Sequence, residues 1–180
     1  MFNKFELFGA GISVLLMAVA IYLVQVQSSF SGGNQAGNVI SSQAPGVVIV
    51  EQSENTERAR VDAYLQASDD RGNINSMVID DVKLGVGDEV KKGDTVSVHY
   101  VGTLQNGQEF DNSKKRGDPF EFIVGKGMVI EGWDKGLVGM KVGGQRILII
   151  PSDMAYGDNG VGPIPGGATL VFSIELLAIK

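Results

Sequence analysis

Hydrophobic residues follow two contrasting patterns along this chain. From Leu7 to Val24 the sequence runs for eighteen residues without a charge, a length that as a helix crosses most of a bilayer core of about 30 Å. After Asn75 the apolar residues instead come in short β-rich runs that turn residues separate. The first pattern predicts one membrane span, and the second predicts a globular domain built mainly from strands.

Five runs in the globular part carry the strand pattern. In the last of them apolar residues recur at every second position from Leu170 to Leu176, so this set, which includes Phe172, is expected to face a core. The Asn106-Gly107 pair separates the first two runs and favours a tight hairpin, because both residue types accept positive φ. The predicted strands are Thr95 to Leu104, Glu109 to Asn112, Phe120 to Val124, Gln145 to Ile150 and Thr169 to Ile179.

One helix interrupts these strands. Its apolar stripe recurs at helical spacing and consists of Ile130, Trp133, Leu137 and Met140, and a glycine pair at 143 and 144 ends the pattern. Gly136 lies near this stripe and lowers helix propensity by up to about 1 kcal/mol relative to Ala, which is tolerable if close approach to the sheet requires it. One sheet wrapped on one helix predicts an α+β domain.

Changes in composition divide the chain into four predicted segments. Residues 1–27 form a membrane anchor, with a cleaved secretory signal as the alternative. Residues 28–52 are rich in Ser, Gly, Asn and Gln and are expected to be a flexible linker. Residues 53–75 hold a charged helix, and its part 53–67 either rests one face on the following domain or pairs two copies of the chain. Residues 76–180 form the globular domain.

Charge around the apolar run sets its expected orientation. Lys4 precedes the run, and no Lys or Arg follows it until Arg58. The positive-inside rule therefore puts the N-terminus in the cytoplasm. The chain is expected to be a single-pass protein of the inner or plasma membrane, with its globular domain on the periplasmic or external face.

Overall composition excludes several kinds of chemistry. The formal net charge of −6 argues against binding to nucleic acid, which needs clustered Lys and Arg to neutralise phosphates. The chain has no cysteine and one histidine, and its globular part shows neither a phosphate-binding glycine loop nor an acidic pair at metal-ligand spacing. We therefore expect no metal and no cofactor. An apolar pocket that works by shape and desolvation is the chemistry that remains.

Six short runs occur in a fixed order along the globular part. They are Val98-His99-Tyr100-Val101-Gly102, Glu109-Phe110-Asp111-Asn112-Ser113, Pro119-Phe120-Glu121-Phe122, Val129-Ile130-Glu131-Gly132-Trp133, Ala155-Tyr156-Gly157 and Ala168-Thr169-Leu170-Val171-Phe172. Together they resemble the FK506-binding (FKBP-type) peptidyl-prolyl cis-trans isomerases. The resemblance covers roughly Met77 to Lys180 and none of the preceding segments.

The resemblance implies an FKBP-like α+β fold, in which a curved antiparallel sheet of five or six strands wraps around one short helix. It also implies a pocket in which the proline ring of a substrate rests on Trp133. The residues implied to be catalytic are Tyr100, Phe110, Asp111, Trp133, Tyr156 and Phe172. Those implied to bind substrate are Phe120, Val129, Ile130, Ile164 and Arg116.

Polar groups have particular roles in this resemblance. The Tyr156 hydroxyl and the Ile130 backbone N–H are implied to donate hydrogen bonds to ligand carbonyls, and Arg116 is implied to pair with Asp111. The chain departs from the best-known members in the segment 157–168, where Val161 takes the place of their histidine.

The implied activity is rotation of Xaa-Pro bonds in proline-containing polypeptides, with FK506-like macrolides as inhibitors. Combined with the predicted periplasmic placement, this activity suggests a foldase for exported proteins. The alternative is a non-catalytic module that uses the same pocket to bind proline-containing segments. Asp111 and Tyr156 favour the enzyme, because members that have lost catalysis tend to lose polar pocket residues.

Overall fold

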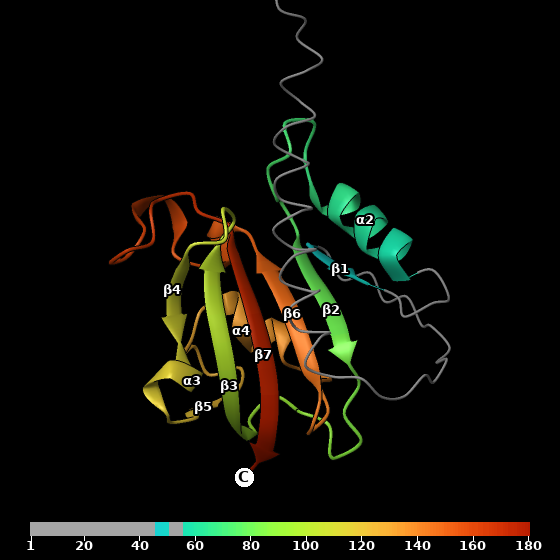
Figure 1. Cartoon of the computed structure of the whole chain (residues 1–180), viewed down its shortest axis with the longest axis vertical. Coiled ribbons are helices and arrows are strands. Elements are labelled where there is room, and N and C mark those ends of the chain that lie inside the picture. Colours follow the sequence, from blue (N-terminus) through green and yellow to red (C-terminus); the bar gives the residue numbers. More distant parts are fainter. Residues whose placement is uncertain (1–45, 51–55) are drawn as a thin grey trace, which may run out of the picture.

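A mixed sheet forms the body of the protein in the computed structural model, which describes residues 46–50 and 56–180 (Figure 1). Within these residues the strand order is β1-β2-β6-β7-β3-β4, and β5 also pairs with β3. Strand β1 runs parallel to β2, and the other pairs are antiparallel. The strands are β1 (Val47–Ile49), β2 (Met77–Lys83), β3 (Thr95–Leu104), β4 (Glu109–Asn112), β5 (Phe120–Ile123), β6 (Gln145–Ile150) and β7 (Leu170–Ile179).

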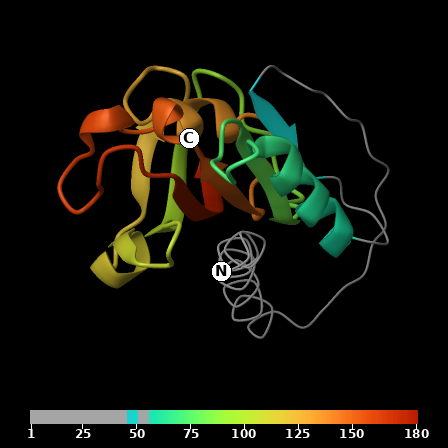
Figure 2. The ribbon, with the colours of Figure 1, turned by 90° about the horizontal axis from the view of Figure 1, so that it is seen from above.

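The helical elements in the described part of the chain are short, with the exception of α2. They are α2 (Thr56–Ala67), α3 (Ser113–Arg116), α4 (Glu131–Gly136) and the two 3-10 turns η1 (Ser152–Met154) and η2 (Gly157–Asn159). Figures 1 and 2 show α2 beside β1 at one edge of the sheet, whereas the segment 151–169 projects on the side of β4. Helices α4 and α2 pack on opposite faces of the sheet. We call the face under α4 the inner face and the face under α2 the outer face.

Alternation along the strands separates the inner from the outer sheet face. Phe172, Ile174 and Leu176 of β7 are buried in the main core on the inner face, as their spacing predicts. Leu137 and Met140 are buried in the same core, although α4 already ends at Gly136. The helix is therefore shorter than its apolar stripe, because the chain turns beyond it through residues that include a glycine with the left-handed φ of 81° at position 139.

The sequence pattern does not predict β1 and β2. Strand β1 falls within the predicted linker 28–52, yet Val47 and Ile49 pair with Met77 and Ile79 of β2. Strand β2 lacks a clean alternation of apolar and polar residues because both of its faces are covered: Val78 packs on the outer face, and its two neighbours pack on the inner face. The antiparallel sheet of five or six strands is thus corrected to a mixed sheet with two further strands at one edge.

A second apolar core lies on the outer face of the sheet, beneath α2. Ala63, Tyr64 and Ala67 of α2 are buried there against apolar side chains of β2 and β6. Arg60 Nε donates to Asp80 Oδ2 over 2.8 Å and ties the helix to β2. Of the two roles predicted for this helix, the structure supports packing on the following domain, and it gives no support to pairing of two copies. The boundary predicted near residue 75 separates two segments that share a core.

The predicted span Leu7 to Val24 lies outside the described residues, as does the linker up to residue 45. The choice between a retained anchor and a cleaved signal also concerns residues that the structure does not describe. Within 46–50 and 56–180, no helix combines the length and the apolar character needed to cross a membrane.

The second core predicts that the globular domain is stabilised by residues before 76. A fragment of residues 76–180 exposes Val78, Ile147 and Ile149, which α2 covers in the whole chain, and burying one such side chain contributes about 1.5–3 kcal/mol. We expect this fragment to unfold at a lower urea concentration than a fragment of residues 46–180, followed by circular dichroism. Equal midpoints would show that α2 and β1 add nothing to stability.

Asp80 predicts a pH-dependent contribution to stability. Burial raises the pKa of its carboxyl above the ordinary value of 3.8, and the attraction of Arg60 offsets only part of that rise. The folded state then binds the Asp80 proton more tightly than the unfolded state does. The contribution of Asp80 to stability therefore falls as pH rises from the ordinary pKa to the raised one.

Urea unfolding of the wild type and Asp80→Asn at a series of pH values measures this effect. We expect the free energy of unfolding of the wild type, minus that of Asp80→Asn, to decrease as pH rises from the ordinary pKa of Asp80 to its raised pKa. The subtraction removes the titration of all carboxyls that the two proteins share. A difference that grows with pH would mean that the ion pair with Arg60 outweighs burial.

Candidate functional site

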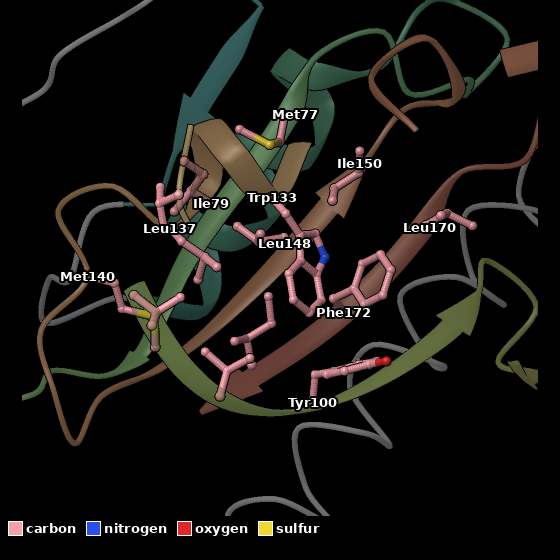
Figure 3. Packing of buried hydrophobic residues seen from close by; sticks show 14 of the residues in the cluster. Met77, Ile79, Tyr100, Trp133, Leu137, Met140, Leu148, Ile150, Leu170 and Phe172 are labelled. Carbon is pink, nitrogen blue, oxygen red and sulfur yellow. The ribbon is translucent and has the colours of Figure 1, made fainter. Parts of the chain in front are cut away.

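Six aromatic side chains meet on the inner face of the sheet, and we call them the aromatic cluster: Tyr100, Phe110, Phe120, Phe122, Trp133 and Phe172. Trp133 of α4 lies at the centre (Figure 3). Its ring centroid is 5.0 Å from that of Tyr100 and 5.2 Å from that of Phe172, with interplanar angles of 87° and 84°. Edge-to-face contacts of this kind are a favoured geometry for aromatic pairs.

The aromatic cluster has a buried floor and a half-buried border. Tyr100, Trp133 and Phe172 are exposed by only 7%, 4% and 4%, so packing fixes their positions. Phe110 and Phe120 are half-buried and present apolar surface to solvent. The predicted residues Tyr100, Phe110, Phe120, Trp133 and Phe172 are therefore brought together, with the floor held by the core and the border accessible.

The position of Trp133 depends on two glycines of α4. A Cβ atom at Gly132 would lie 2.5 Å from Ile150 Cγ2, and one at Gly136 would lie 2.7 Å from Leu148 Cδ1. Both distances are far below the 3.5–4.0 Å or so at which carbon atoms pack. Helix α4 thus rests directly on β6, and Gly136 has the close approach to the sheet that its sequence position suggests.

Three polar side chains lie together at the border of the aromatic cluster, and we call Tyr100, Asp111 and Arg116 the polar triad. The Tyr100 hydroxyl donates to Asp111 Oδ2, and Arg116 Nη1 donates to Asp111 Oδ1. Arg116 Nη2 donates to the Tyr100 hydroxyl oxygen over 2.9 Å, and its guanidinium carbon lies 5.5 Å from the centre of the Tyr100 ring. The contact between Arg116 and Asp111 that the resemblance implies is present.

Electrostatics keeps Asp111 ionised and Tyr100 protonated. Burial is the largest influence on the pKa of Asp111 and raises it, but hydrogen bonds from Tyr100 and Arg116 together bring that pKa below its ordinary value. Burial raises the pKa of Tyr100, and the hydrogen bond to Asp111 raises it further. At neutral pH the carboxylate is therefore an acceptor and the phenol a donor, an arrangement suited to orienting groups rather than to exchanging a proton.

Helix α3 places Arg116 beside the triad. The helix starts after Asn112, whose side-chain oxygen accepts from two backbone N–H groups of the first turn over 3.0 and 3.2 Å, and it stops at Gly117, where φ is 88°. Ser113 is fully buried, and its hydroxyl oxygen accepts from the Tyr100 N–H over 2.8 Å. This bond joins α3 to β3. Sequence reasoning did not single out Ser113, because the role depends on a strand thirteen residues away in the chain.

The other predicted residues lie on loops around the aromatic cluster. Val129 and Ile130 are half-buried and immediately precede α4, and Tyr156, which follows η1, is 39% exposed. Ile164 is only 6% exposed and forms an antiparallel bridge with Val161. Ile164 is thus as buried as the floor of the aromatic cluster and belongs to the same core.

Three hydrogen-bond donors near the aromatic cluster have no acceptor within residues 46–50 and 56–180. Trp133 Nε1 is buried without a partner, and neither the Tyr156 hydroxyl nor the Ile130 backbone N–H donates to a described residue. Burial raises the pKa of Tyr156, so its hydroxyl stays protonated at neutral pH. Unpaired donors around an apolar floor suit a ligand that is largely apolar and carries carbonyl oxygens.

Comparison with known proteins finds close relatives of this domain. Residues 87–177 match the family described as FKBP-type peptidyl-prolyl cis-trans isomerase. The chain is 61% identical over 89 residues to FK506-binding protein 2 of Aspergillus oryzae, which covers 49% of this chain and 66% of the relative. It is 51% identical over 107 residues to FK506-binding protein 4 of Gibberella zeae, which covers 59% of this chain but only 21% of the relative. The chain thus spans about a fifth of that relative's length.

Similarity extends to a solved structure. The crystal structure of AtFKBP13 superposes with a TM-score of 0.56 at 38% sequence identity, and the match covers 63% of this chain and 98% of that one.

The single-pass, periplasmic-facing placement predicted from the apolar run is wrong. The relatives named above are fungal, hence eukaryotic, proteins, whereas a periplasmic face belongs to bacterial cell envelopes. A foldase role for exported proteins depended on that placement and loses its argument. The bacterial-like, membrane-anchored form of the domain likewise finds no support.

The contact between α4 and β6 predicts that Gly132→Ala is destabilising. The added methyl would overlap the Ile150 side chain, and overpacking of this kind costs about 1–3 kcal/mol, more than the gain of up to about 1 kcal/mol in helix propensity. We expect a lower urea midpoint together with a shift in tryptophan emission, since Trp133 is the one tryptophan of the chain.

Lys135→Ala is the matched control for that substitution. Lys135 lies on the exposed side of the same helix, where it pairs with Glu131, and exposed pairs at this spacing contribute only about 0.3–0.5 kcal/mol. If both variants shift the midpoint equally and leave the emission unchanged, the glycine contact does not position Trp133.

Proposed function

We propose that this chain, which belongs to the FKBP-type peptidyl-prolyl cis-trans isomerase family, catalyses rotation about Xaa-Pro bonds in polypeptide substrates. The observation that carries the proposal is the apolar floor: Trp133 stands with Tyr100 and Phe172 nearly perpendicular to its ring. A proline ring is apolar and compact, and it can lie on such a floor without losing a hydrogen bond. The half-buried border then covers the flanking atoms.

Roles for the polar residues follow from their partners. We assign the Tyr156 hydroxyl and the Ile130 N–H to substrate carbonyls, since both donors lack an acceptor among the described residues. Asp111 is assigned to orient Tyr100, because its two oxygens are occupied by Tyr100 and Arg116. Phe110, Phe120 and the side chains of Val129 and Ile164 are assigned to the walls.

The activity requires a lower barrier to twisting of a planar amide. The twist breaks the amide resonance, and the uncatalysed barrier of about 20 kcal/mol makes the step take tens of seconds. The planar amide has the larger dipole and is better solvated by water, so transfer to an apolar surface disfavours the planar form more than the twisted one. A 10⁴–10⁶-fold acceleration needs about 5–8 kcal/mol.

No proton transfer is required by this mechanism. Asp111 is held ionised and Tyr100 and Tyr156 are held protonated, so the polar groups stabilise and orient while the apolar surface disfavours the planar amide. A non-catalytic module for proline-containing segments would use the same floor. Turnover, and not binding, distinguishes the two.

The proposal predicts that the purified full-length chain accelerates isomerisation of a short Xaa-Pro peptide and that an FK506-like macrolide blocks it. Asp111→Ala removes the group that orients Tyr100 and should lower kcat/KM by about ten-fold or more, the size expected for hydrogen bonds to a charged group. Tyr156→Phe removes one neutral donor and should lower kcat/KM by about two- to ten-fold. Exchange spectroscopy by NMR measures the rate without a coupling protease.

Tyr64→Phe provides the control, because Tyr64 is buried in the second core on the outer sheet face. It should leave kcat/KM unchanged. Binding of the macrolide without acceleration of the peptide would establish the non-catalytic module instead. Activity that the macrolide does not affect would mean that the aromatic cluster is not the site.

A further inference from the structure

The loop that carries Val129 and Ile130 receives its side-chain hydrogen bonds from one residue, Asp134. We call residues 124–130 the rim loop, since it joins β5 to α4 at the border of the aromatic cluster. Asp134 Oδ1 accepts from the Gly125 N–H over 2.8 Å, and Asp134 Oδ2 accepts from the Gly127 N–H over 2.7 Å. The carboxylate thus spans the loop with both of its oxygens.

The rim loop has few other restraints. Its first residue, Val124, is fixed by backbone bonds with Gly93 and Asp94, each 2.9 Å long. Its last residue, Ile130, accepts from the Trp133 N–H over 3.0 Å. Between these ends, the hydrogen bonds that the described residues make to positions 125–129 come from Asp134.

Backbone conformation makes the loop dependent on that carboxylate. Gly125 and Gly127 have φ values of 76° and 68°, and this left-handed region turns their N–H groups toward Asp134. Glycine gains most conformational freedom when such restraints are lost. Met128, the next residue, is 60% exposed, so apolar packing holds the loop only from Val129 and Ile130 onward.

Asp134 follows Trp133 directly in α4. The same helical turn therefore supplies the floor of the aromatic cluster through Trp133 and fixes the rim loop through Asp134. We propose that Asp134 is a positioning residue that sets the distance between Trp133 and the Ile130 N–H, and thereby the affinity for a substrate that touches both. This inference rests on the proposed function.

Asp134 binds the rim loop and not the polar triad, and this determines which kinetic parameter it affects. The triad is built on β3, β4 and α3, and it makes no hydrogen bond to Asp134 or to the rim loop. Loss of Asp134 should therefore weaken substrate binding while the twisting of bound substrate stays nearly as fast. KM rises and kcat is preserved when an interaction contributes equally to ground and transition states.

Two variants of the full-length chain test the proposal, because they remove different numbers of the hydrogen bonds from Asp134 to the rim loop. Asp134→Ala removes both bonds. Asp134→Asn keeps one acceptor and turns an amide donor toward a backbone N–H, so it loses one bond with little change of volume. Glu131→Gln is the control: it neutralises an acid on the same helix that pairs only with the exposed Lys135.

Kinetics with a short Xaa-Pro peptide and titration with an FK506-like macrolide give the first readout. We expect Asp134→Ala to raise KM and the macrolide Kd about ten-fold, which corresponds to about 1.4 kcal/mol, with kcat changed less than two-fold. Asp134→Asn should lie between Asp134→Ala and the wild type. Glu131→Gln should match the wild type. A fall in kcat at constant KM would overturn the proposal.

Amide hydrogen exchange gives a second readout that does not require activity. The Gly125 and Gly127 amides should exchange at least about ten-fold faster in Asp134→Ala, while core amides of β6 and β7 keep their protection. Unchanged exchange at both glycines would overturn the inference even if the chain is an isomerase. An inactive wild type with faster glycine exchange in the variant would instead refute the proposed function. Global loss of protection in both Asp134 variants would make Asp134 a residue of overall stability and overturn its positioning role.

Discussion

The close contact of α4 with β6 is the constraint on which the site depends. Helix α4 has six residues, far fewer than the dozen or more that an isolated helix needs in water. It persists because Gly132 and Gly136 let its backbone rest on Ile150 and Leu148. Trp133, between the two glycines in sequence, is thereby pressed into the core, where its ring is buried among other aromatic rings.

The end of α4 is secured by a buried charge. Arg146 of β6 donates to the carbonyl oxygens of Gly136 and Val138 over 2.7 and 3.1 Å, which satisfies acceptors that a helix end leaves unpaired. The same guanidinium pairs with both oxygens of Asp81 on β2. Arg146 is buried while Asp81 is partly exposed, so removal of Asp81 would leave a buried cation without its carboxylate partner, which is destabilising. Strands β2 and β6 therefore fix the end of α4 on the inner face of the sheet through Asp81 and Arg146. Helix α2 covers the outer face of the same two strands.

Sequence reasoning succeeded where a local pattern carries the signal and failed where contacts join distant segments. The alternation on β7 and the stripe around Trp133 are local, so the core direction of Phe172 and the existence of α4 could be predicted. Strand β2 was not predicted, because it is covered on both faces and its sequence therefore shows no alternation of apolar and polar residues. Ile164 was expected at a ligand, and it lies in the same core cluster as Trp133 and Phe172, so its contact with a ligand stays a prediction. Arg146 offered a signal that was overlooked: a single charge directly before four aliphatic residues of the same strand.

The polar triad shows how charge can border an apolar floor at little cost. The side chains of Asp111 and Arg116 are 39% and 48% exposed, so neither is stripped of water, and a pair of this kind contributes little to folding stability. Its geometry is nevertheless over-determined, since Arg116 binds both Asp111 and the Tyr100 hydroxyl. This network adds little stability, yet it fixes the Tyr100 ring at the edge of the aromatic cluster. We therefore infer that its role is to orient Tyr100 for binding of a ligand on that apolar surface. The orientation of Tyr100, which a packed core alone would leave free at its hydroxyl end, is thus set by the groups that border the site.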